Sequence, residues 1–344
     1  MIYKLILTLR DAYYRGGRHS VKADVPTVCV GNITAGGTGK TPHTELILRM
    51  LLASEKWGGK VIAVLSRGCK RRSRGFQQLP VGATALLYGD EPAQIKREFP
   101  NVTVAVDKDR IEGCKLLKAD LVVLDDAYQY RKLQADLNIV LSDFNRPVTT
   151  DSLLPSGRLR DLGRRLYDAD AVIVTKCPPD MNEAEKLEAA RTLGYDSYDP
   201  ASCIATHCGG SQSLFFTTIR YGQPEPVFPT ADIRYTYSQK LVLLSGIAND
   251  TPLFNYLSDS YKITEHLRFP DHHRYHRSDV RLMMAALKRN PTAAFVTTEK
   301  DALRLEDLKK IPPKLQERLF YIPIGVEFLT ATEHDKFNEI LMTI

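Results

Sequence analysis

A glycine-rich stretch, NITAGGTGKTP at residues 32–42, carries the clearest chemical signal of this 344-residue chain. It lies between an apolar run at 25–30, which predicts a strand, and a segment at about 40–54 with helical periodicity. Glycine-rich loops bind phosphate in this context, because backbone N–H groups converge where no Cβ intervenes and the following helix adds its positive dipole end. Lys40 would reach the terminal phosphates, and the Thr41 hydroxyl would bind Mg²⁺.

Thr34 replaces the first glycine of the usual G-x-x-x-x-G-K-[ST] pattern, and the rest of the pattern is intact. A guanine-reading [NT]KxD motif is not intact, because the acidic residue expected after Thr175-Lys176 is displaced to Asp180. We therefore predict a kinase rather than a GTPase. The predicted nucleotide-binding residues are Thr34, Gly36, Gly37, Thr38, Gly39, Lys40 and Thr41.

Two adjacent aspartates, Asp125 and Asp126, follow the apolar run at 121–124. Open α/β sheets bind ligands at the carboxyl ends of their strands, so these carboxylates should lie beside the phosphate loop. An acidic turn after a strand is common, but beside such a loop the pair favours a metal site. We expect one of the two, together with Thr41, to hold Mg²⁺ directly or through water. The sequence leaves open which one.

A cationic segment, LSRGCKRRSRG, follows the second predicted strand. Such charge runs are usually solvated. This one should open at the same sheet edge as the phosphate loop, which favours capture of an anionic substrate by residues such as Arg67.

Two further segments carry groups suited to proton transfer. Asp90 and Glu91 of GDEP precede a predicted helix, and helix capping by itself accounts for them. The loop RFPDHHRYHR contains Asp271, His272, His273 and His276. Zinc binding is one interpretation of this loop, and an aspartate-oriented histidine that transfers a proton is the sharper one.

Short β-branched runs alternate with helical segments along the first two-thirds of the chain, which predicts a parallel sheet covered on both faces. The predicted strands are 25–30, 61–65, 102–106, 121–124, 139–141 and 171–174, and the predicted helices are about 40–54, 91–98, 108–118 and 182–193. Residues 203–238 read as an extended hairpin or linker. A second alternation follows it, with a strand that ends in a loop within KLVLLSGIAND, strands at 263–267, 293–297 and near RLFYIPI, and helices from 251 and at 278–288. We predict a P-loop NTPase-like domain at 1–203 and a smaller α/β domain at 204–344.

Composition sets outer limits on function. The chain has 43% hydrophobic and 26% charged residues, as soluble globular proteins have, and its formal net charge is +6. Six scattered cysteines without a CxxC pair argue against a zinc site or disulfide framework and fit a reducing cytosol. We expect no signal peptide and no membrane-spanning segment.

The N-terminus, MIYKLILTLRDAYYRGGRH, places apolar residues at helical spacing among cations. Such a helix could lie on an anionic lipid surface or dock on the protein's own core, and the sequence favours neither.

Taken together, these motifs resemble the tetraacyldisaccharide 4′-kinase family of lipid A biosynthesis. The resemblance runs through most of the chain and includes the threonine-for-glycine phosphate loop. Its segments are VGNITAGGTGKTP, VLSRG, GDEP, LDDAYQYRKLQADLNIVL, LLPSGRLRD, ADAVIVTK, FPDHHRY and TEKDALRL.

The resemblance implies transfer of the ATP γ-phosphoryl group to the 4′-hydroxyl of an acylated disaccharide 1-phosphate, which gives lipid IVA. It implies a peripheral enzyme at the cytoplasmic face of the bacterial inner membrane, with ATP and Mg²⁺ as cofactors. The expected partners are the lipid substrate and the anionic membrane surface, and not nucleic acid.

Motif matching also assigns residues by resemblance. Asp90 would take the proton of the acceptor hydroxyl, with His272, or less readily His273, as its partner. Arg160 and Asp161 would lie near the phosphates on the substrate side, with Asp161 standing where the family has glutamate.

Two alternatives remain at this point. One is a P-loop kinase for a soluble sugar or metabolite. The other is a nucleotide-dependent switch or metallochaperone whose histidine-rich loop carries the metal.

Overall fold

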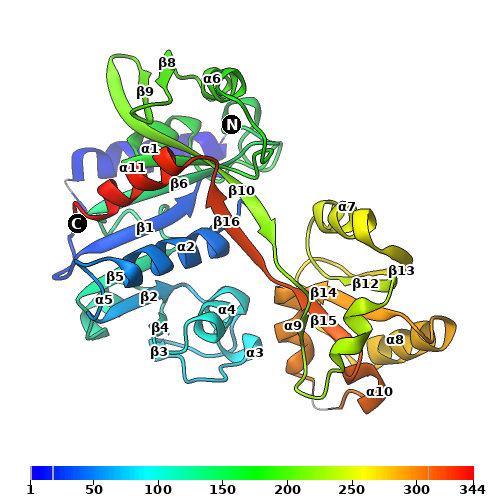
Figure 1. Ribbon diagram of the computed structural model, residues 1–344. Coiled ribbons are helices and arrows are strands. Elements are labelled where there is room, and N and C mark those ends of the chain that lie inside the picture. Colours follow the sequence, from blue (N-terminus) through cyan, green and yellow to red (C-terminus); the bar gives the residue numbers. More distant parts are fainter. Residues whose placement is uncertain (1, 18, 309) are drawn as a thin grey trace.

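Eleven strands form one sheet in the first domain of the computed structural model, which describes residues 2–17, 19–308 and 310–344 (Figure 1). Its central strands pair in parallel and are buried on both faces, as near-continuous apolar runs require. In sheet order the strands are β3 (Gln77–Gln78), β4 (Thr103–Val106), β2 (Ile62–Ser66), β5 (Leu121–Asp125), β1 (Thr27–Asn32), β6 (Leu137–Asp143), β7 (Ala171–Thr175), β10 (Gly210–Tyr221), β9 (Ile204–His207) and β8 (Ser197–Asp199), with β16 (Ile324–Phe328) also paired to β10.

Helices pack on both faces of this sheet. On one face Ile47, Ile95 and Phe337 share a core with Val28 and Val30, and on the other a second core forms around Cys29 and Leu124. The first face carries α2 (Lys40–Ala53), α4 (Asp90–Glu98) and α11 (Ala331–Leu341), and the second carries α5 (Arg110–Leu116), α6 (Glu183–Thr192) and the 3-10 turn η3 (Gly163–Asp168). The short helix α3 (Ala85–Tyr88) precedes α4, and a 3-10 turn, η2 (Val148–Thr150), follows β6.

The second domain has its own five-stranded sheet with apolar clusters on both faces. In sheet order the strands are β11 (Glu225–Pro226), β15 (Leu319–Ile322), β14 (Ala294–Thr298), β12 (Lys240–Ser245) and β13 (Lys262–Arg268). Its helices are α7 (Thr251–Ser260), α8 (Arg277–Arg289), α9 (Glu299–Glu306) and α10 (Pro313–Gln316), with a 3-10 turn, η4 (Ile233–Tyr237). The smaller α/β unit expected from the second alternation is therefore present.

Two antiparallel strands join the domains (Figure 1). The second half of β10 runs out of the large sheet and pairs with β16, from Thr217 opposite Phe328 to Tyr221 opposite Ile324. After β16 the chain returns to the first domain, where Phe328 and Phe337 lie in the core with α2. The structure thus differs from the predicted division at 203/204, because residues 204–221 and 324–341 belong with the first domain and the second is inserted between them.

Helices α4 and α9 meet between the domains. The Gln94 side-chain amide donates to Glu45 of α2, at 3.2 Å, and to Glu299 of α9, at 3.0 Å. Burial first, and the neighbouring acids after it, raise the pKa of Glu45 to about 8 and that of Glu299 to about 7. Part of the contact between domains therefore rests on carboxyl groups that are readily protonated.

The N-terminal helix α1 (Ile2–Tyr14) docks through polar groups. Buried Asp11 accepts a hydrogen bond from Arg131 at 2.6 Å, and the Tyr3 hydroxyl donates to the Arg160 carbonyl at 2.9 Å. The apolar residues that face solvent form what we call the outward stripe: Ile2, Leu5, Ile6, Leu9 and Tyr13, each 54% to 77% exposed. Docking and an apolar outer surface, which the sequence presented as alternatives, thus occur in the same helix.

No helix in the described parts of the chain has the length and apolar character needed to cross a bilayer.

Candidate functional site

The glycine-rich loop links β1 to α2, as predicted, and its backbone explains its residue types. Gly36 and Gly39 have φ of +114° and +85°, a region that strains side chains with a Cβ. Thr34 does not need this conformation. It is buried and forms an antiparallel bridge with Leu159, and the neighbouring Ala35 N–H donates to the Arg158 carbonyl at 2.7 Å. Threonine fits the position of the missing glycine because the chain is extended there.

Side chains from neighbouring strands hold the loop in place. Asn32 donates to the Thr38 hydroxyl at 2.7 Å, so the Thr38 side chain points into the protein and braces the loop. Thr175 donates to the Thr38 carbonyl at 3.0 Å, and Lys176 donates to the Gly37 carbonyl at 2.5 Å. The Thr175-Lys176 pair, noted in the sequence as a broken guanine-reading motif, thus supports the phosphate loop.

Lys40 at the start of α2 faces Asp126, with 3.9 Å between Nζ and Oδ1. Arg160 also donates to Asp126, at 3.2 Å from Nη1 to Oδ2, and to the side chain of Asn32. Burial favours the neutral acid, but the charges of Lys40 and Arg160 outweigh it and hold the pKa of Asp126 below its usual range. Burial lowers the pKa of Lys40. Two cations and one carboxylate therefore lie where the phosphates of a nucleotide would bind.

Asp125 has a different environment. Its Oδ2 accepts from Ser66 at 3.0 Å, and its buried Oδ1 has no hydrogen-bond partner among the described residues. Burial, and then the charges of Asp126 and Glu91, raise the pKa of Asp125 to about 6. Within the described ranges, no three His, Cys, Asp or Glu side chains form a metal-binding cluster. A buried carboxylate oxygen without a protein partner does fit Mg²⁺, which takes its remaining ligands from phosphate and water.

Asp90 of the first domain bonds to two side chains of the second domain. Its Oδ2 lies 3.0 Å from Nδ1 of His272 and accepts at 3.2 Å from Nε of Arg304, and both partners belong to the second domain. Burial opposes ionisation, but hydrogen bonds from His272 and Arg304 together hold the pKa of Asp90 far below its usual range. Its Oδ1 has no hydrogen bond to any described residue and is left for another donor.

The capping role expected for Asp90 and Glu91 is wrong. The N-cap of α4 is Gly89, and no side chain caps that end. Glu91 instead forms an ion pair with Lys300 at 3.1 Å. Consecutive acids of the first domain thus pair with cations one helical turn apart on α9, Lys300 and Arg304.

The three histidines of the RFPDHHRYHR loop do not share one site: the rings of His273 and His276 lie 6.4 Å apart beside Asp279, and His272 contacts Asp90. His272 has φ of +59° and donates its backbone N–H to the Gly246 carbonyl at 3.1 Å, which holds its ring toward Asp90. His273 instead lies 2.9 Å from Asp279 and stacks on Phe269. The structure therefore brings His272, rather than His273, to Asp90, and this arrangement does not fit the zinc interpretation.

The remaining predicted site residues are Arg67, Arg160 and Asp161, and the structure places only the first two at the phosphate-loop edge of the sheet. Arg160 faces the phosphate loop, and exposed Arg67 follows β2 at the same edge of the sheet. The substrate-binding role predicted for Asp161 is wrong. Its side chain is fully buried and accepts a hydrogen bond from Arg131 at 2.7 Å, so it cannot contact a substrate. Its buried partner Arg131 also holds Asp11 of α1.

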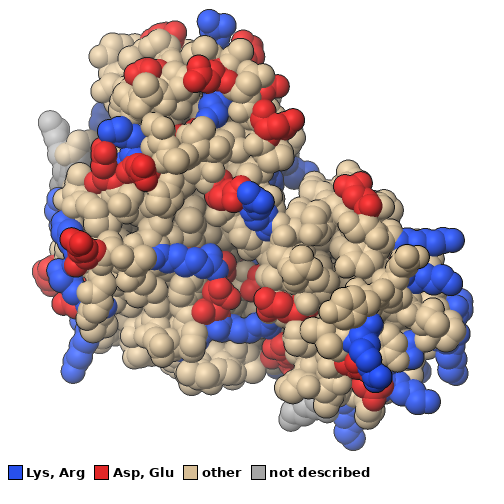
Figure 2. Space-filling model, in the orientation of Figure 1, with Lys and Arg blue, Asp and Glu red and all other residues tan. Residues whose placement is uncertain are grey.

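The surface is hollowed between the two domains, and Figure 2 shows acidic and basic side chains along both walls. Glu91 stands next to Asp90 in the chain and is near enough to Asp125 to raise its pKa. The Asp90–His272 pair therefore lies near the carboxylates beside the phosphate loop. Such a site suits transfer of a phosphoryl group from a nucleotide to a hydroxyl.

Comparisons with known proteins agree with this chemistry. The family model for tetraacyldisaccharide-1-P 4′-kinase matches residues 1–344. A tetraacyldisaccharide 4′-kinase of Parabacteroides distasonis is 40% identical over 336 residues, covering 93% of this chain and 85% of the relative. One of Flavobacterium johnsoniae is 38% identical over 345 residues, covering 97% and 92%.

A solved structure has the same fold. The crystal structure of LpxK from Aquifex aeolicus in complex with ATP superposes with a TM-score of 0.70 over 98% of this chain and 95% of that one, at 23% identity. The predicted P-loop-type α/β fold is confirmed.

Proposed function

Because the chain belongs to the tetraacyldisaccharide-1-P 4′-kinase family, we propose that its interdomain cleft holds ATP on one wall and the acceptor sugar on the other. The enzyme is an ATP-dependent tetraacyldisaccharide 4′-kinase of lipid A biosynthesis. Membership of the family decides against the soluble-sugar kinase and the metallochaperone. Which residues carry out the reaction is our assignment.

On the donor wall, backbone N–H groups of residues 36–41 bind the phosphates, and Lys40 neutralises their charge. Asp126 holds Lys40 and Arg160 in place before the nucleotide arrives. Thr41 and Asp125 would hold Mg²⁺, which supplies further positive charge at the phosphates when bound. We assign Asp125 as the direct ligand because its buried Oδ1 has no protein partner, while Asp126 is occupied by cations.

On the acceptor wall, Asp90 receives the proton of the 4′-hydroxyl through its free Oδ1. The hydroxyl oxygen then forms a bond to the γ-phosphorus while the bond to the bridging β,γ-oxygen breaks, and ADP leaves. His272 and Arg304 fix the carboxylate and keep it ionised at neutral pH. Arg67 and its cationic loop are placed to attract the anionic acceptor.

The Asp90–His272 contact carries this assignment, because it joins groups 182 residues apart across the cleft. Positioned proton acceptors typically contribute ~10²–10⁴-fold to rate.

The test is phosphorylation of a tetraacyldisaccharide 1-phosphate by ATP and Mg²⁺ in detergent. Asp90→Asn and His272→Ala should lower kcat by ~10²–10⁴-fold while ATP still binds. His273→Ala is the matched control, since its ring pairs with Asp279 in the same loop. Loss of turnover in His273→Ala alone would mean that the wrong histidine has been assigned.

We also propose that the enzyme acts at the cytoplasmic face of the inner membrane as a peripheral protein. The outward stripe of α1 supports this, because apolar side chains there would enter the lipid interface. Exposed Lys4, Arg10 and Arg15 flank the stripe and suit an anionic surface.

A further inference from the structure

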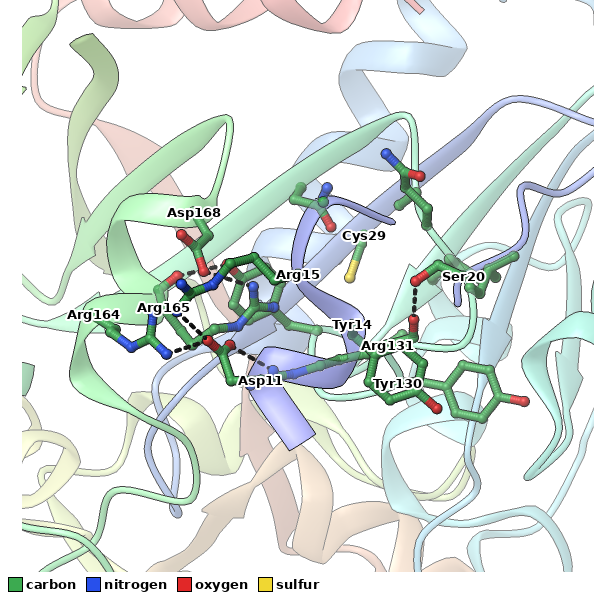
Figure 3. Close-up of a pocket in the computed structure, with 18 residues that line it drawn as sticks. Asp11, Tyr14, Arg15, Ser20, Cys29, Tyr130, Arg131, Arg164, Arg165 and Asp168 are labelled. Atoms are coloured by element: carbon green, nitrogen blue, oxygen red, sulfur yellow. Dashed lines mark hydrogen bonds and ion pairs between the residues drawn. The ribbon is translucent and has the colours of Figure 1, made fainter. Parts of the chain in front are cut away.

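A second cavity lies away from the cleft, beneath the end of α1 and the following 3-10 turn η1 (Arg15–Gly17) (Figure 3). Its volume of about 610 Å³ is within the range of small-molecule sites. Lys40, Asp90, Asp125 and His272 do not line it. The proposed reaction therefore leaves this cavity unexplained.

One part of the cavity wall is apolar, although polar side chains such as Gln134 and Asn138 also line the cavity. It reaches the face of the sheet opposite α2, at the centre of the domain, where a covering helix would ordinarily fill the space. The residues that form this apolar part are Cys29, Leu124, Ala127, Leu133 and Ala135, all of them buried. Such a lining binds an apolar chain by removing it from water.

Arginines line the cavity nearer to α1. Figure 3 shows Asp11 between Arg131 and Arg164, with Arg15 beside it. Four arginines line the cavity: Arg15, Arg131, Arg164 and Arg165. They pair with Asp11 and Asp168 of the lining and with buried Asp161 behind it, which leaves a formal surplus of one positive charge. Arg131 is buried, and its Nε has no hydrogen-bond partner among the described residues. These cations suit a carboxylate or phosphate.

The position of the cavity indicates where such a molecule comes from. Asp11 and Tyr14 line it from the face of α1 opposite the outward stripe, as the helical period of 3.6 residues requires, and Arg15 follows them. The cavity thus lies directly behind the surface that we assign to lipid. A chain leaving the bilayer beside α1 would meet arginines first and the apolar part next.

We propose that this cavity binds an acyl chain with an anionic head group. A free fatty acid and one chain of an anionic lipid share this chemistry. The inference relies on the proposed membrane contact of α1 only for the source of the chain, and it does not depend on the catalytic assignment.

The first test is a titration of the full-length protein with cis-parinaric acid, whose fluorescence rises in apolar sites. The wild type should bind it, and Ala135→Trp, which fills the apolar part, should weaken binding at least tenfold. Ala201→Trp, at an exposed turn outside the cavity, is the matched control and should bind normally. Equal binding by the wild type and Ala135→Trp would overturn the proposal.

A second variant tests the proposal independently, in case Ala135→Trp does not fold. Arg15 is exposed, so Arg15→Glu should fold normally, and it should weaken parinaric acid several-fold while leaving the affinity for ATP unchanged. An unchanged affinity for parinaric acid would contradict the role of the cationic lining. If oleate displaces the bound parinaric acid and phosphatidylglycerol vesicles do not, the natural ligand is a free fatty acid. If the vesicles displace it, the ligand is a membrane lipid. No displacement by either would also refute the site, and retained ATP binding separates that outcome from failure of the kinase assignment.

Discussion

Replacing Glu45 with glutamine should make the first domain more stable at pH 8 and leave it unchanged at pH 5. Glu45 is 2% exposed and accepts one hydrogen bond from Gln94 at 3.2 Å. Its nearest cation, Arg49, lies 4.0 Å away and is itself half exposed. Burial therefore dominates and raises the pKa of Glu45 from 4.5 to about 8.

The sign follows from proton linkage. The folded protein binds a proton that the unfolded chain has already released, so folding is favoured most below the ordinary pKa of 4.5 and less as the pH rises through about 8. Each pH unit in that window is worth about 1.36 kcal/mol. Between pH 5 and pH 8 the wild type should lose on the order of 3–4 kcal/mol from this group.

Glutamine keeps an oxygen for Gln94 and has no charge to bury, so Glu45→Gln should remove most of this pH dependence. The single tryptophan, Trp57, lies in the same core as α2, so its fluorescence during urea unfolding reports on this domain. Glu98→Gln is the control, since Glu98 forms a partly exposed pair with Arg49 and should change stability by less than ~1 kcal/mol. The reasoning fails if the wild type and Glu45→Gln lose stability equally between pH 5 and pH 8.

Two further predictions concern function. Arg304→Met should lower kcat ~10–100-fold with little change in KM for ATP, because Asp90 loses the hydrogen bonds that orient it. Arg97→Met is the control. It breaks a more exposed interdomain ion pair with Glu306 and should leave kcat within about twofold. An equal loss in both variants would mean that Arg304 acts only by holding the domains together. Replacing Leu5 and Leu9 with serine should weaken sedimentation with phosphatidylglycerol vesicles at least tenfold without changing kinetics on a detergent-dispersed acceptor, and unchanged sedimentation would contradict membrane contact through the outward stripe.

Short-range sequence patterns predicted the elements that carry the phosphate-binding residues well. The strand expected at 121–124 is β5 and carries Asp125, and the helix expected at about 40–54 is α2. These elements are determined by short-range periodicity and by glycines at positive φ, both of which can be read from neighbouring residues. The predicted fold and the kinase family are confirmed for the same reason, since the motifs that carry them are contiguous.

Long-range pairings were not predictable from the sequence. Arg304 meets Asp90 across 214 residues, and a single sequence offers no signal that these charges are neighbours. Asp161 matched a motif but points away from the site, because its side chain satisfies buried Arg131. The return of β16 and α11 to the first domain was missed, since an apolar periodic segment looks the same whichever sheet it packs on.

The paired strands β10 and β16 suggest how the molecule could be reduced to one domain. Tyr221 and Ile324 are register partners, so the chain leaves and re-enters the first domain at neighbouring points. A two-residue turn can join antiparallel strands at such points. Splicing Tyr221 to Ile324 through a short turn would therefore remove the 102 residues from 222 to 323 as one insertion within a continuous hairpin. The shortened protein would keep the phosphate loop and Asp90 but lose His272 and Arg304, the two partners that fix the Asp90 carboxylate.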